Sequence, residues 1–199
     1  KVPDAADLAL IRKTEELKSA EWVPTFRMMN GGETRRNDPA GITHVHHFYT
    51  GRNRIALAAF NSKCSSPLLR SLVTTVAFRI TKRYGLTYQA GTWGAGGGPT
   101  SGTLYIPSLV KELNMFEMIE NAISKVDAKQ DIKSRNAIIS TQACQGFKLP
   151  KNSLDYVFID PPFGANIMYA ELNFLWEAWL GVLTEEKFET IESKSQNKK

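Results

Sequence analysis

An apolar run at residues 156–159, which ends at Asp160-Pro161-Pro162-Phe163, constrains the fold of this chain more than any other feature. A short run of aromatic and β-branched residues that stops at a proline is typical of a buried strand in a parallel sheet. Ligands of open α/β sheets bind outside the carboxyl ends of such strands. We therefore expect the side chain of Asp160 to face a cleft.

Helical patterns surround this predicted strand. Apolar residues recur at helical spacing in five stretches: residues 3–17, 52–61, 67–84, 107–126 and 169–183. Residues 137–141 form a second predicted strand, whereas residues 29–41 read as a polar loop. Because helices and strands alternate near the end of the chain, the pattern predicts the α/β class with a mainly parallel sheet and a helical N-terminal portion.

The length and composition fit one domain or a large part of one. The chain has 199 residues, of which 42% are hydrophobic, so it can bury a substantial core. We divide it into a mainly helical portion at 1–130 with a glycine-rich loop at 91–102, a core segment at 131–184 that carries the tetrapeptide, and a polar tail at 185–199.

Net charge and cysteine usage bear on the kind of partner and on the cellular compartment of the protein. The net charge of +5 is compatible with a polyanionic partner, although it is weak evidence alone. Cys64 and Cys144 lie far apart and form neither a Cys-x-x-Cys pair nor a secreted disulfide pattern, which predicts free thiols in a reducing cytoplasm. Neither a signal peptide nor an apolar run of membrane-spanning length appears in the sequence.

Residues 154–180 read LDYVFIDPPFGANIMYAELNFLWEAWL, with the Asp-Pro-Pro-Phe tetrapeptide, a Tyr-x-Glu-Leu-Asn segment and a helix that carries tryptophan. This stretch resembles the S-adenosylmethionine-dependent amino-group methyltransferases, the site-specific DNA methylases that act on adenine N6 or cytosine N4. Residues 48–53 (FYTGRN) and the segment 93–108 are also similar to these proteins. The resemblance implies a partial Rossmann-like methyltransferase fold, S-adenosylmethionine as cofactor, and double-stranded DNA with a flipped base as partner.

The chemistry of the tetrapeptide follows from its atoms. An exocyclic amino nitrogen shares its lone pair with the ring of the base, so it is a poor nucleophile. The side chain of Asp160 and the carbonyl of Pro161 can accept its two N–H groups and localise the pair. Pro162 stiffens the backbone, and Phe163 offers a ring for stacking on the flipped base. An ordinary strand-to-loop turn is the alternative interpretation.

A complete enzyme of this class should also have a loop resembling Phe-x-Gly-x-Gly after its first strand, and no such loop occurs in this sequence. Residues 91–102 are the nearest candidate, but no apolar strand leads into them and no helix follows directly. We interpret them as a mobile loop over the target or the DNA backbone, or equally as a flexible surface connection. We expect the chain to be a fragment cut at both ends, and its cofactor-binding residues stay unknown.

Several residues outside the tetrapeptide are candidates for binding. Asn166 and Tyr169 would line the target pocket, whereas Glu171 and Asn173 would fix the loop by hydrogen bonds, with helix capping as the alternative. Two tryptophans on one helix face are predicted to lie in the core: Trp176 and Trp179.

Basic side chains provide further candidates. Arg52 and Arg54 are candidates for contacts with DNA phosphates, and surface salt bridges are the alternative. Lys82 and Arg83 are predicted to be solvated.

All three histidines lie in the segment His44-Val45-His46-His47, where His44 and His46 would share one face of a strand. No cysteine or carboxylate follows at zinc-ligand spacing. We therefore predict a structural role and no metal site.

Taken together, the sequence predicts a fragment of a DNA methyltransferase. Adenine N6 is favoured over cytosine N4 because the tetrapeptide begins with Asp160, whereas cytosine enzymes of this family more often have serine there. The alternatives are a non-catalytic DNA-binding or interaction module, and a methyltransferase that acts on RNA or a protein glutamine. The recognition sequence, the oligomeric state and the role in restriction-modification, regulation or phage defence are left open.

Overall fold

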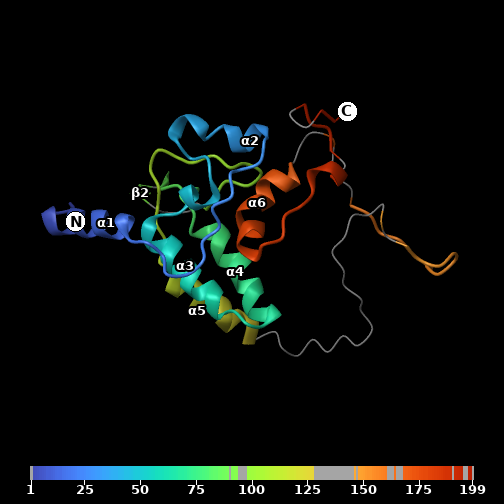
Figure 1. Cartoon of the computed structure of the whole chain (residues 1–199), viewed down its shortest axis with the longest axis horizontal. Helices are drawn as coiled ribbons and strands as arrows, with labels where there is room; N and C mark the ends of the chain where they lie inside the picture. Colours follow the sequence, from blue (N-terminus) through green and yellow to red (C-terminus); the bar gives the residue numbers. More distant parts are fainter. Residues whose placement is uncertain are drawn as a thin grey trace.

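The computed structural model describes a predominantly helical chain (Figure 1). The described residues are 2–89, 91–93, 98–127, 146, 148–160, 164, 168–189, 191–194 and 197–198. Its α-helices are α1 (Ala5–Glu16), α2 (Gly32–Arg35), α3 (Gly51–Lys63), α4 (Pro67–Arg79), α5 (Met115–Asp127) and α6 (Tyr169–Leu180). The 3-10 helices are η1 (Asp38–Ala40), η2 (Val45–Phe48) and η4 (Glu186–Phe188), and the strands are β1 (Tyr88–Gln89) and β2 (Thr92–Trp93).

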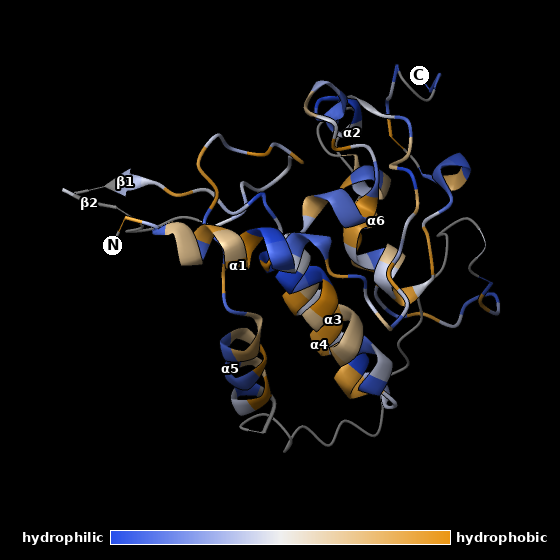
Figure 2. Cartoon of the chain, turned by 60° about the vertical axis from the view of Figure 1, so that its left-hand side comes forward, coloured by the Kyte–Doolittle hydropathy of each residue, from blue (hydrophilic) through white to orange (hydrophobic). Residues whose placement is uncertain are grey.

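Helix α4 lies at the centre and packs on α3, α5 and α6 (Figure 1). It buries Leu72, Val73, Val76 and Ala77, whose spacing places them on one side of the helix. The neighbouring helices bury apolar residues in the same core: Leu57, Ala58, Met115, Ile119, Phe174, Leu175 and Trp179. Figure 2 shows hydrophobic and hydrophilic residues on opposite sides of α5, as its packing against α4 requires.

Local signals in the sequence account for the ends of the helices. Asp4 caps α1 by accepting hydrogen bonds from the backbone N–H groups of Ala6 and Asp7. Ser66 caps α4 through Leu69 N. Gly181 adopts a left-handed conformation with φ of 70° directly after α6, which ends that helix. The helices predicted in stretches 3–17, 67–84 and 169–183 are therefore confirmed with shorter boundaries, and the helix predicted at 52–61 is confirmed with slightly longer ones.

Helix α5 begins later than the sequence predicts. Residues before it are held in an extended arrangement, because Leu86 N donates to Leu109 O at 2.8 Å and Lys111 N donates to Tyr84 O at 2.7 Å. Asn114 then caps the helix by accepting the backbone N–H of Phe116 at 3.0 Å. The predicted start at residue 107 is wrong because these backbone contacts outweigh the local signal of proline and serine. The predicted polar loop at 29–41 also contains α2 and η1.

The predicted mainly parallel sheet, and with it the Rossmann-like arrangement, is wrong for the part of the chain that the structure describes. The strands β1 and β2 pair with each other antiparallel over two residues each. Residues 156–159 form no strand, and the exposed fractions of Tyr156 and Phe158 are 80% and 81%. A central parallel strand needs hydrogen-bonded neighbours and covered faces, and the described residues supply neither here. The strand predicted at 137–141 lies outside the described residues.

Within the described ranges, every helix is too short or too polar to cross a membrane.

Candidate functional site

Asp160 is the one residue of the tetrapeptide that lies in the described part of the chain. It is exposed at the end of segment 148–160, which is exposed throughout and forms neither helix nor strand, rather than inside a cleft. Pro161, Pro162 and Phe163, and also Asn166, lie outside the described residues. Asp160 forms no ion pair with any described residue.

The first turn of α6 follows this segment and is held from two sides. Tyr169 is its first residue, and its side chain is 41% exposed. Ala170 N donates to the carboxylate of Glu189 at 2.9 Å. Glu171 is fully buried, and its Oε2 accepts the backbone N–H groups of Glu33 at 2.9 Å and Thr34 at 3.0 Å. These two N–H groups belong to α2, whose own first turn leaves them without partners.

The prediction that Glu171 fixes the loop after the tetrapeptide stays a prediction, because residues 161–163 and 165–167 lie outside the described residues. The hydrogen bonds that the structure describes match the alternative, helix capping. Glu171 caps α2, a helix far away in the sequence, rather than its own helix. Asn173 is half-buried, and its predicted role stays a prediction.

Helix α6 also places its tryptophans as predicted. Trp179 is 2% exposed, and its ring meets the ring of Tyr49 edge-on at 5.7 Å between centroids. Trp176 is half-buried and packs edge-on against Phe78 at 5.4 Å. Burial also raises the pKa of Tyr49 far above its usual value. Trp179 therefore serves the core and leaves no face for a base.

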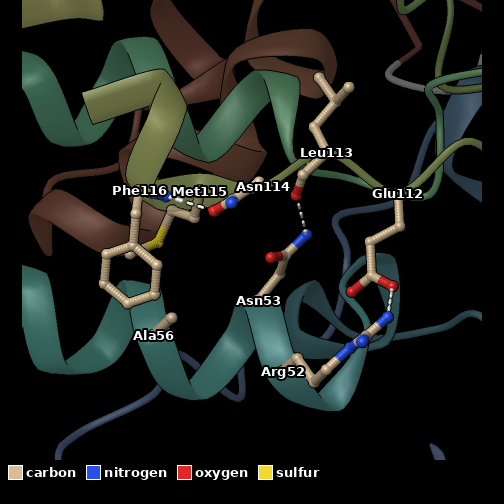
Figure 3. A pocket seen from close by; sticks show the side chains of 8 residues that line it. All are labelled: Arg52, Asn53, Ala56, Glu112, Leu113, Asn114, Met115 and Phe116. Atoms are coloured by element: carbon tan, nitrogen blue, oxygen red, sulfur yellow. Dashed lines mark hydrogen bonds and ion pairs between the residues drawn. The ribbon is translucent and has the colours of Figure 1, made fainter. Parts of the chain in front are cut away.

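A pocket of about 380 Å³ lies between the first turns of α3 and α5 (Figure 3). Arg52 lies at its rim and forms an ion pair with Glu112. Thr50, the N-cap of α3, also donates its hydroxyl to Glu112. This arrangement matches the salt-bridge alternative for Arg52 rather than a free phosphate contact. Arg54 is half-buried and makes no ion pair within the described ranges.

The same pocket contains residues that sequence reasoning missed. Asn53 is 5% exposed, and its side-chain Nδ2 donates to the backbone carbonyls of Leu113 at 3.2 Å and Ile80 at 3.4 Å. Phe116 lines the pocket with a ring that is 64% exposed. An asparagine in the first turn of a helix has many possible roles, and the sequence places Phe116 on the apolar face of α5. No signal in the sequence distinguishes them.

The histidine segment forms a compact cluster on η2. The ring centroids of His46 and His47 lie 4.3 Å apart, and His44 lies 5.2 Å from His47. Burial, followed by repulsion from His47, His44 and Arg54, lowers the pKa of His46 to about 4. Burial and the neighbouring His44 also lower the pKa of His47.

The local structure of the histidine segment differs from the prediction. Val45–Phe48 is a 3-10 turn, so the expectation that His44 and His46 share a strand face is wrong. The described residues contain no group of three His, Cys, Asp or Glu side chains that could hold a metal ion.

Arg83 is buried, and its predicted solvation is wrong. It is 2% exposed, its Nη2 donates to the carbonyls of Thr100 at 3.0 Å and Thr103, and its guanidinium lies 4.5 Å from the centre of the Phe78 ring. Burial lowers its pKa to about 10. Arg83 thereby ties residues 100–103 to the end of α4. In the sequence, Arg83 stands beside another basic residue, Lys82. Nothing in the sequence indicates which of the two side chains is buried.

Comparisons with known proteins add no relatives to this description. Neither the family models, nor the curated proteins, nor the solved structures include a match to this chain. The function must therefore be argued from the residues themselves.

Proposed function

We propose that this chain is part of an S-adenosylmethionine-dependent DNA methyltransferase that methylates an exocyclic amino group, adenine N6 in preference to cytosine N4. The observation that carries the proposal is the succession of Asp160-Pro161-Pro162-Phe163 and the Tyr-x-Glu-Leu-Asn segment that begins at Tyr169. Double-stranded DNA with a flipped base is the proposed partner, and the cytoplasm is the proposed location.

The roles concern the acceptor base. Asp160 accepts one amino hydrogen and the carbonyl of Pro161 accepts the other, which localises the lone pair of the nitrogen. Phe163 stacks on the base. The exposed carboxylate of Asp160 and the partly exposed ring of Tyr169 support this assignment, because both are accessible to a large substrate.

The cofactor would supply the methyl group, but the described residues do not fit a site for it. A strand that leads through a glycine loop into a helix would hold such a cofactor, and the described ranges contain no such unit. We therefore assign no residue of this chain to the cofactor.

A non-catalytic DNA-binding module is the second candidate function. The same missing unit favours it, together with the net charge of +5. DNA binding that weakens with salt, without any methyl transfer, would distinguish it from the enzyme.

Transfer of a tritiated methyl group from S-adenosylmethionine to duplex DNA of mixed sequence, catalysed by the enzyme of which this chain is proposed to be a part, tests the proposal. Asp160→Ala should lower the rate roughly a hundredfold, because an acceptor for the reacting amino group is lost. Asp155→Ala is the matched control, since Asp155 is exposed in the same segment and lies outside the tetrapeptide. Equal rates for the two variants, or no transfer by the wild type, would leave the methyltransferase proposal without support.

A further inference from the structure

The pocket between α3 and α5 has an acceptor atom that no described residue uses. Both hydrogen bonds of Asn53 Nδ2 go to backbone carbonyls, those of Leu113 and Ile80. Since carbonyls only accept, these two bonds fix the orientation of the amide group. The oxygen Oδ1 is then the atom presented to the pocket. It is not among the atoms that are sealed from solvent without a partner, and no donor from the described residues reaches it. Figure 3 shows this oxygen turned toward the side of Met115 and Phe116.

Burial makes this acceptor notable. Asn53 is 5% exposed, so its position is set by packing and by the two bonds of its nitrogen. A polar side chain at such depth normally uses both its donor and its acceptor groups. An oxygen held rigidly toward an open pocket is suited to a ligand with an N–H donor.

An aromatic wall faces the same space. The ring of Phe116 lines the pocket and remains 64% exposed, whereas its neighbour Met115 is 2% exposed. Ala56, on α3, adds a short side chain to the wall and leaves room beside the ring (Figure 3). A flat ligand can stack on Phe116, because an exposed aromatic face gains by covering its surface.

The charges of the pocket are already paired. Glu112 receives the guanidinium of Arg52 and the hydroxyl of Thr50. Neither a free cation nor a free carboxylate therefore faces the ligand from this pair. Because these charges are paired, the pocket favours a neutral ring over an isolated phosphate as its ligand.

We propose that this pocket binds a nucleobase with an exocyclic amino group, which donates to Asn53 Oδ1 while the base stacks on Phe116. The volume of about 380 Å³ lies in the usual range for small-molecule sites. The inference rests on the proposed function for the choice of an unpaired base in DNA as the ligand. It extends that function by assigning a base-binding site on α3 and α5 that requires neither Asp160 nor the cofactor.

Fluorescence anisotropy with a short fluorescein-labelled strand of oligodeoxyadenylate tests the inference. Phe116→Ala should weaken binding about tenfold, the effect expected from the loss of one stacked base. Phe116→Trp should bind close to the wild type, because the larger ring preserves stacking. Phe188→Ala is the matched control: Phe188 is 46% exposed on η4, and its removal should leave binding unchanged.

A strand of purine deoxyriboside tests the hydrogen bond separately, because this base keeps the ring but lacks the amino group. The wild type should bind it about fivefold more weakly than oligodeoxyadenylate. Equal binding of the two strands would overturn the assignment of Asn53 Oδ1.

The outcomes separate this inference from the proposed function. Equal affinity of Phe116→Ala and the wild type, or the absence of strand binding by the wild type, would overturn the base-binding site whatever the methyl-transfer assay shows. Strand binding that depends on Phe116, in a protein without methyl transfer, would uphold the site and remove the methyltransferase proposal.

Discussion

Replacing Gly31 by alanine would drive a methyl group into the buried carboxylate of Glu171. A Cβ at residue 31 would lie 1.9 Å from the carboxylate carbon of Glu171 and 2.1 Å from each of its oxygens. The φ of Gly31 is −173°, an extended conformation that alanine adopts without strain. The entire penalty therefore comes from the contact.

The expected magnitudes follow from the packing. Glu171 is 0% exposed and cannot leave, so overpacking by Gly31→Ala should cost about 2–3 kcal/mol of unfolding free energy. Glu171→Ala should cost about 3–5 kcal/mol, because Glu33 N and Thr34 N lose a charged acceptor. In the double variant the methyl group enters the space left by the carboxylate. Its destabilisation should therefore be about 2 kcal/mol less than the sum of the single variants.

Urea unfolding monitored by far-ultraviolet circular dichroism measures all three variants. Gly32→Ala is the control, because a Cβ at this neighbouring position meets nothing within 4 Å, and alanine favours a helix over glycine. It should leave the stability unchanged or slightly raised. Single-variant effects that add to within about 0.5 kcal/mol would refute the proposed contact.

Two further predictions concern stability. The pKa of His46 is about 4 in the folded chain and 6.5 in the unfolded chain, so protonation favours the unfolded state. The free energy of unfolding therefore falls as the pH drops from 6.5 toward about 4. Between about pH 7 and about pH 5, the free energy of unfolding of His46→Gln should fall by about 1 kcal/mol less than that of the wild type, after allowance for solvent screening. Urea unfolding at the two pH values measures this difference, and equal falls would contradict the prediction. Trp179→Ala should lower the free energy of unfolding by about 3–5 kcal/mol, because its ring is buried. Trp22→Ala should lower it by about 1 kcal/mol or less, because the ring of Trp22 is exposed and meets Trp179 at 6.3 Å between centroids. Thermal unfolding measures both variants, and similar losses would contradict the buried position of Trp179.

The helices could be predicted because their signals are local. Asp4, Ser66 and Gly181 each act within a few residues of a helix end, so the sequence nearby is sufficient. The sheet could not be predicted in this way. A strand is stabilised by neighbours that are distant in sequence, and the apolar run at 156–159 specifies only that such neighbours would be favourable. The structure shows the run exposed.

In the candidate site, too, the features that depend on consecutive residues could be predicted, and those that depend on distant residues could not. The tetrapeptide at Asp160 is visible in the sequence because its chemistry is contained in consecutive residues. Helix capping by Glu171 was only the alternative in the sequence, and its partners Glu33 and Thr34 are 138 and 137 residues away, so their identity required the structure. The burial of Arg83 likewise depends on carbonyls at Thr100 and beyond.

Glu171 and Asn53 show how the structure separates a structural polar group from one available to a ligand. Each is at most 5% exposed, and each uses one side-chain atom to bind two backbone groups. The second oxygen of Glu171 is buried and receives no donor from the described residues, so it adds to the cost of burial. The oxygen of Asn53 opens onto a pocket beside an exposed aromatic ring, where a ligand can supply the missing donor. Glu171 accepts through a carboxylate and Asn53 donates through an amide, so the chemistry of their bound atoms does not decide which one a ligand can reach. The space beyond the unused oxygen decides this, and it supports the binding proposed for Asn53 and the structural role of Glu171.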